Sequence, residues 1–184
     1  MPITSADPNA TVSVSDWSVV GEASAHEALA ADSDSSYVLS VANGATIECG
    51  LEDLSLPSGA RIVRVEIRAR CHGTSVPLKA ELVGVSPPVS GVVVPATTGL
   101  YTVAVTNTND ITESEFNAAT LKLTNTSGGT LLAYTAYARI LYLNKPTLTI
   151  DAPTGTITDD DTPTVEWTPT SSDAPQTAYE VKIM

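Results

Sequence analysis

Hydrophobic and polar residues alternate along much of the first 145 residues, with the period of two that is typical of strands buried on one face. The clearest run is 62–70, where apolar and charged residues take turns. Its apolar positions, which we expect to face a core, are Val63, Val65, Ile67 and Ala69, and its outward positions are Arg64, Glu66, Arg68 and Arg70. The same pattern predicts strands at 11–14, 17–20, 37–41, 45–51, 62–70, 78–83, 89–94, 101–106, 121–124 and 131–143.

Turn residues separate these runs, as at Asn43-Gly44, and two short helical turns interrupt them. Ser24 and Thr112 each stand three residues before a glutamate, which is the spacing of a capping box. They predict one- or two-turn helices that end near residues 31 and 119. No predicted helix is long enough to cross between parallel strands, so we expect an all-β fold of antiparallel sheets.

Two modules are predicted, with a boundary at Asn144-Lys145-Pro146. Residues 1–145 form a β-sandwich, and Pro146 discourages continuation of its last strand. The 39 residues after Lys145 resemble the opening strands of an immunoglobulin- or fibronectin-like sandwich. In this interpretation Trp167 lies on the second strand and contributes to the core of that sandwich. Because that class takes about 100 residues, we expect residues 146–184 to be an incomplete module of a longer modular protein.

Charge is distributed unevenly along the chain. The net charge of -12 argues against nucleic-acid binding, which needs clustered Lys and Arg. Residues 1–60 hold nine carboxylates and no Lys or Arg, whereas residues 61–145 carry a charge of +3 and residues 146–184 carry -6. Such separation predicts complementary patches that meet inside the domain or across a subunit contact.

The outward arginines Arg64, Arg68 and Arg70 are the main candidate binding residues. One interpretation is a stripe that docks on an acidic surface of a neighbouring subunit, for which the carboxylates before residue 60 are an obvious partner. The alternative is a solvated strand face whose arginines are partly paired within the chain.

The sequence contains no recognisable signal for secretion or for insertion into a membrane. The first residues lack the basic start and apolar stretch of a signal peptide, and no later run has the length of a membrane span. We therefore expect a protein made in a cytosol and not inserted in a membrane. In that compartment Cys49 and Cys71, both on apolar strand positions, are predicted to be buried thiols, with a disulfide between facing strands as the alternative.

Asp32 and Asp34, in the run Asp32-Ser33-Asp34-Ser35-Ser36, are the candidate metal ligands. Alternate Asp and Ser oxygens on a turn can coordinate calcium. The alternative is an Asp-rich turn whose side chains cap backbone amides before the following strand. An EF-hand is excluded because Tyr37 and Asn43 stand where that loop needs Gly and Glu. The run 159–161 is predicted to be a solvated turn.

No catalytic, metal or cofactor residues are assigned. His26 and His72 lack metal-ligand spacing to a partner, and no nucleophile elbow or phosphate loop occurs. Sugar stacking on exposed aromatic rings is a further possibility. Tyr134 shares a strand phase with Ala136, Ala138 and Ile140, and Tyr137 shares one with Arg139 and Leu141, so some of the tyrosines are expected to be exposed. Packing in a sheet or subunit contact is the alternative.

Several segments together resemble the jelly-roll modules of virion proteins from tailed phages of actinobacteria. The likeness covers residues 10–143 and is carried by Asp16-Trp17-Ser18, Ala28-Leu29-Ala30, the run 32–38, the run 54–62 and the run 65–70. Such proteins are called minor tail proteins, and similar modules decorate capsids. The resemblance implies a jelly-roll fold and no catalytic residues.

The function expected from this resemblance is structural. The chain would be a non-enzymatic virion component, a minor tail or tail-tip protein that contacts copies of itself, other virion proteins and a host cell-surface glycan. The alternatives are a capsid decoration protein, whose first domain grips the shell, and, from another class, a carbohydrate-binding adhesin or a wall-degrading enzyme.

Overall fold

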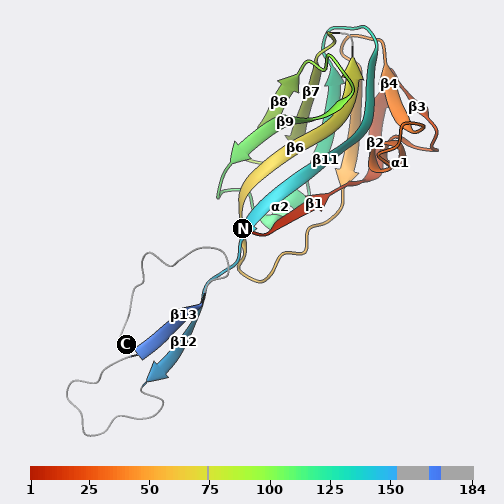
Figure 1. Ribbon diagram of the computed structural model, residues 1–184. Coiled ribbons are helices and arrows are strands. Elements are labelled where there is room, and N and C mark those ends of the chain that lie inside the picture. Colours follow the sequence, from red (N-terminus) through yellow and green to blue (C-terminus); the bar gives the residue numbers. More distant parts are fainter. Residues whose placement is uncertain (74, 153–165, 171–184) are drawn as a thin grey trace, which may run out of the picture.

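A computed structural model describes residues 1–73, 75–152 and 166–170 of the chain (Figure 1). Two antiparallel sheets, of six and five strands, pack face to face as a β-sandwich. The all-β prediction is therefore confirmed. The elements are β1 (Ile3–Ala6), β2 (Pro8–Ser15), β3 (Trp17–Val20), α1 (Ala25–Ala30), β4 (Tyr37–Ser40), β5 (Thr46–Leu51), β6 (Arg61–Gly73), β7 (Leu78–Val83), β8 (Val89–Val93), β9 (Gly99–Asn107), α2 (Glu113–Asn117), β10 (Thr120–Asn125), β11 (Leu131–Leu143), β12 (Thr147–Ala152) and β13 (Glu166–Thr170).

Two long strands, β6 and β11, form the centre of the six-stranded sheet. They pair from Leu131 opposite Gly73 to Leu143 opposite Arg61, and the sheet order is β3-β4-β11-β6-β9. The edge of β11 away from β6 is divided between two partners: β4 pairs with its first residues and β1 with residues 138–141. The five-stranded sheet has the order β2-β5-β10-β7-β8.

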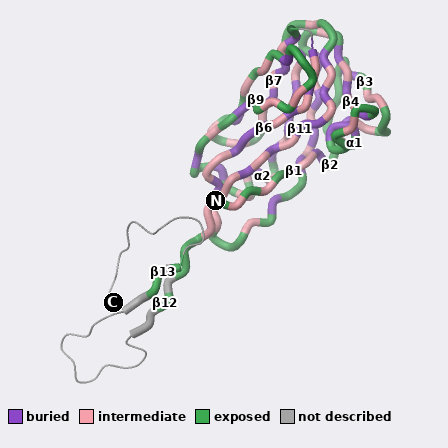
Figure 2. The backbone as a smooth tube through the Cα atoms, in the orientation of Figure 1, coloured by how far each residue is buried: buried purple, intermediate pink, exposed green. Residues whose placement is uncertain are grey.

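The core lies between the two sheets and is mostly apolar, and Figure 2 shows the buried residues that form it. Side chains of β6 and β11 that face it alternate with outward ones, as the period-two pattern predicted. The short helix α1 buries Ala25, Ala28 and Leu29 against β2, β4 and β11, so it covers one open side of the sandwich. On another side β8 and β9 approach closely at Gly91, where a Cβ atom would lie 2.0 Å from the Val103 carbonyl oxygen.

Helix α2 ties a long loop to the body of the domain. Its Phe116 is fully buried, and its Asn117 accepts from the Leu54 amide at 2.8 Å and donates to the Leu54 carbonyl at 3.1 Å. Glu113 accepts from the Leu56 amide at 3.0 Å. The capping box predicted at Thr112 is present in full, whereas Ser24 accepts from the Glu27 amide and donates to the Glu27 carboxylate.

Three details differ from the sequence prediction. Strand β1 was not predicted, because it is short and of mixed polarity and gains its place by pairing with β11. In β6 the register shifts between Ile62 and Arg64, so that Ile62 is buried and Val63 is only half-buried. A second shift in β11, between Ala133 and Thr135, removes Tyr134 from the inward phase that it was predicted to share with Ala136.

Beyond Leu143 the chain leaves the sandwich and forms a hairpin of β12 and β13, which pair antiparallel as a separate two-stranded sheet. Figure 1 shows this hairpin past the end of the domain at which β11 ends. The predicted turn at 159–161 and the remainder of the second module lie outside the described residues.

Candidate functional site

The outer face of the six-stranded sheet carries four of the nine Lys and Arg residues of the chain. Arg64, Arg68 and Arg70 project from alternate positions of β6, and Arg139 projects from the neighbouring strand β11. The predicted stripe therefore lies on one face. The three stripe arginines differ sharply, however, in what surrounds them.

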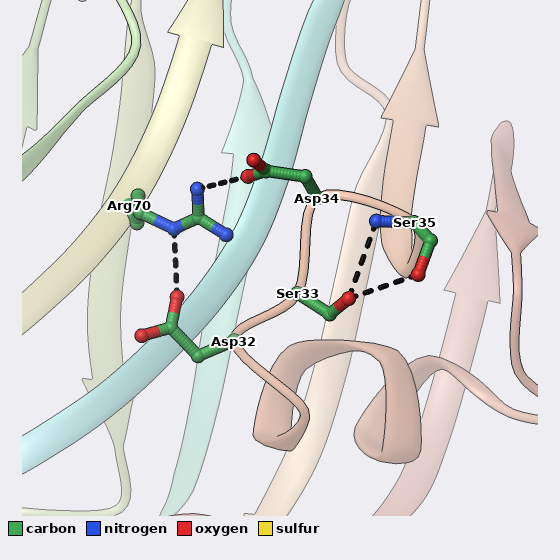
Figure 3. Close-up of polar contacts among 5 residues, drawn as sticks. All are labelled: Asp32, Ser33, Asp34, Ser35 and Arg70. Atoms are coloured by element: carbon green, nitrogen blue, oxygen red, sulfur yellow. Dashed lines mark hydrogen bonds and ion pairs between the residues drawn. The ribbon is translucent and has the colours of Figure 1, made fainter.

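Arg70 is held by the two candidate calcium ligands (Figure 3). Its Nε donates to Asp32 Oδ1 at 2.7 Å and its Nη1 donates to Asp34 Oδ1 at 2.5 Å. The pKa of the guanidinium is raised, first by the hydrogen bond to Asp34, with further contributions from Asp32, against an opposing effect of burial. The acidic turn after α1 is thus pinned to the centre of the sheet, and Ser33 accepts from the Ser35 amide within the turn.

An aromatic pair continues this contact. The Arg70 guanidinium lies 4.6 Å from the centre of the Tyr134 ring, and the Tyr134 and Tyr37 rings are 5.6 Å apart and tilted by 58°. The bulge in β11 is what turns Tyr134 to this face. Since the two rings are not coplanar and one ring face is covered by Arg70, the pair does not offer a flat platform for a sugar.

Glu66 forms the opposite arrangement nearby. Its carboxylate is 6% exposed and contacts Arg64 Nη2 at 2.6 Å and Arg139 Nη1 at 3.2 Å. Each of its oxygens has a charged donor, so the carboxylate is buried but paired. The sequence correctly placed Glu66 on the outward face but not its burial, which arises because arginines from two strands cover it.

Arg68 lies between these two groups and has no ion pair with any described residue. Together with Ile3, Thr4, Ser5, Tyr137 and Arg139 it lines a shallow pocket. The Nε atom of Arg68 is buried and has no hydrogen-bond partner within the described part of the chain. Sequence reasoning grouped Tyr137 with Arg139 by their strand phase, but it missed the contribution of β1, which was not predicted.

The outer face of the five-stranded sheet has a different character. Glu48 and Glu81 flank Lys122 in register across three neighbouring strands, and Lys79 forms an ion pair with Glu81. Thr120 donates to Glu48 at 2.5 Å. Charges of opposite sign therefore alternate across this face, as in an ordinary solvated sheet surface.

Other candidate residues take structural positions. Among the residues that the structure describes, no group of three or more potential ligands could hold a metal ion. Cys49 and Cys71 are free and buried, and burial raises the pKa of each thiol to about 12. His26 Nδ1 contacts the hydroxyls of Thr11 and Ser24 at 3.0 Å and 2.9 Å, which joins α1 to β2.

Trp17 is buried in the core, and nothing is described of the Trp167 side chain. Within the described residues, no helix is long and apolar enough to cross a membrane. Comparisons of the chain with protein-family models, with curated proteins and with solved structures found no match.

Proposed function

We propose that this chain is a non-enzymatic structural component of a tailed-phage virion, a minor tail or tail-tip protein whose first domain is a jelly-roll module. It assembles with copies of itself and with other virion proteins. The hairpin β12–β13 begins an immunoglobulin-like module that projects from the particle and contacts a glycan of the host surface.

The observation that carries the proposal is the unequal charge of the two outer sheet faces. Around Glu66 the larger sheet presents Arg64, Arg68 and Arg139, an excess of cations in a chain whose net charge is -12. An open sheet face of this kind suits docking on an acidic protein surface. No deep apolar cleft is needed for such a function.

A capsid decoration protein is the second candidate. The projection of the hairpin beyond one end of the sandwich favours it as much as the first, because a domain that grips a shell and a domain that extends outward would be arranged in this way (Figure 1). The adhesin alternative has less support, since the tilted Tyr37 and Tyr134 rings do not form a sugar platform.

The test is to locate the protein on particles. An antiserum raised against the full chain is used for immunogold labelling of virions from a phage that encodes it, and mass spectrometry of purified particles measures its abundance. We expect labelling at the tail or tail tip. Labelling over the head would establish the decoration role instead, and absence of the chain from purified particles would refute both.

A further inference from the structure

The pocket beside Arg68 is built from hydrogen-bond donors. Arg68 and Tyr137 are opposite each other in the β6–β11 register, and Arg139 and Ser5 are opposite each other in the β11–β1 register. Two guanidinium groups, a phenol and a serine hydroxyl thus border one depression, with Thr4 also at its wall. A group that enters this pocket meets donors and positive charge, so the matching ligand is an anionic acceptor.

The carboxylate nearest in the sheet neutralises only part of the pocket, because it pairs with Arg139 and not with Arg68. Glu66 is shared between Arg64 and Arg139, one guanidinium for each oxygen. Arg68 is left with a buried Nε that lacks a hydrogen-bond partner within the described residues. The Nε atom is covered by the protein, so an incoming carboxylate would meet Arg68 at the part of its side chain that lines the pocket, where it would give the guanidinium the charged partner that it lacks among the described residues.

Another arginine of strand β6, Arg70, already binds carboxylates of this chain. Two residues from Arg68, the guanidinium of Arg70 binds Asp32 and Asp34, which belong to the segment 1–60 that holds nine carboxylates and no Lys or Arg. That segment also carries exposed carboxylates away from Arg70, namely Asp16, Glu22, Glu27, Glu52 and Asp53. A second copy of the chain could bring these carboxylates to Arg68, which has no ion pair with a described residue of its own chain.

We infer that the Arg68 pocket binds a carboxylate from the acidic first sixty residues of a second copy of this chain. The inference rests on the proposed assembly function and names its partner. Planar carboxylates suit the guanidinium fork, and the hydroxyls of Ser5 and Tyr137 complete the donor set. Strand β1 is part of the site, because Ile3, Thr4 and Ser5 form one wall of the pocket.

The experiment measures self-association of the full chain by sedimentation velocity at concentrations up to about 100 μM, a range that detects contacts of micromolar Kd. We expect the wild type to self-associate, and the association to weaken as salt is added. Arg68→Gln, which keeps much of the side-chain length, should raise the Kd by about tenfold or more. Arg61→Gln is the matched control, because Arg61 lies exposed on the same strand and outside the pocket.

A second variant tests the partner. Neutralising Asp16, Glu22, Glu27, Glu52 and Asp53 together, as Asn or Gln, leaves the arginine face intact and should weaken association as strongly as Arg68→Gln. Circular dichroism and thermal unfolding confirm that each variant is folded. The inference is overturned if the wild type stays monomeric, if Arg68→Gln associates like Arg61→Gln, or if the neutralised variant associates normally.

These outcomes are separate from the test of the virion function. A chain that is present on particles but monomeric in solution would lose only the Arg68 contact. A chain that associates through Arg68 but is absent from particles would lose only the virion function.

Discussion

Two groups of ion-paired side chains lie on the same sheet face. One has a carboxylate between two arginines and the other an arginine between two carboxylates, and they differ in how far the carboxylates are buried. In one, the carboxylate of Glu66 lies between Arg64 and Arg139 and is 6% exposed; in the other, Arg70 lies between Asp32 and Asp34, whose side chains are 60% and 88% exposed. The first joins two central strands, and the second joins a surface turn to a strand. Similar numbers of ion pairs therefore contribute differently, because burial decides what the loss of a partner costs.

Removing the buried carboxylate has the largest expected effect. Glu66→Gln leaves Arg64 and Arg139 facing a neutral amide on two paired strands, and we expect the free energy of unfolding to fall by about 2 kcal/mol. Urea unfolding of the two proteins measures the difference. Glu81→Gln is the control on the other sheet, where the Glu81 carboxylate is 23% exposed, against 6% for Glu66, and a loss below about 1 kcal/mol is expected. Equal losses would remove the distinction between the two settings.

Removing the shared arginine of the exposed group comes next. Arg70→Ala deletes two ion pairs and the contact with the Tyr134 ring, and we expect a loss of about 1 kcal/mol. The local effect is larger than the global one, because the turn 32–36 loses its attachment to β6. Hydrogen exchange of the amides in this turn should quicken by more than that of amides in β11. Uniform protection in both regions would contradict this reading of the contact.

Removing one exposed carboxylate is expected to change little. Asp34→Asn keeps the Asp32 contact with Arg70, and because the Asp34 side chain is mostly in water we expect a loss below about 0.5 kcal/mol that vanishes at high salt. Thermal unfolding at low and high salt measures it. A loss as large as that of Glu66→Gln would show that exposure does not govern these groups.

Asp7 is a partly buried carboxylate that, unlike Glu66, forms no ion pair with an arginine among the described residues, so it tests what burial does to a carboxylate by itself. The pKa of Asp7 is raised, mainly by burial and also by the charge of Glu52. Its ionised form is therefore disfavoured in the folded state, and the stability that its protonated form contributes is lost as pH rises through the raised pKa. Asp7→Asn should increase Tm slightly at pH 7 and leave it nearly unchanged below the ordinary aspartate pKa of about 3.9. A lower Tm at pH 7 would contradict it.

Much of the fold followed from period-two alternation, because both sheets have one face on the core. The predicted bounds of β3, β7 and β11 agree with the structure, and the core side chains of β6 from Val65 onward were identified. Alternation fails where the register shifts. Tyr134 was placed on the wrong face because a bulge is a property of two paired strands, and neither strand alone contains its signal.

The charged face was predictable only in part. The separation of acidic and basic segments predicted that they would meet, and at Arg70 they meet inside the domain. Which arginine is paired depends on the contact between the turn after α1 and strand β6. The two residues that meet there, Asp32 and Arg70, are 38 positions apart in the sequence, so local patterns could not identify the pair. The pocket beside Arg68 needed β1 as well, and four residues of mixed polarity carry too little periodicity to predict a strand.

The division of one β11 edge between β4 and β1 has a mechanical consequence. The chain enters the domain next to the residue where it leaves, since Ile3 is opposite Leu141 and the Tyr142 amide donates to the Pro2 carbonyl. Tension between the two termini would therefore peel β1 from β11 one hydrogen bond at a time. Tension applied between Pro146 and the arginine face would instead act along β11, where the whole ladder to β6 bears the load in shear. We therefore expect the domain to resist tension along β11 better than tension between its termini, because the first must break a long ladder at once and the second only a strand of four residues.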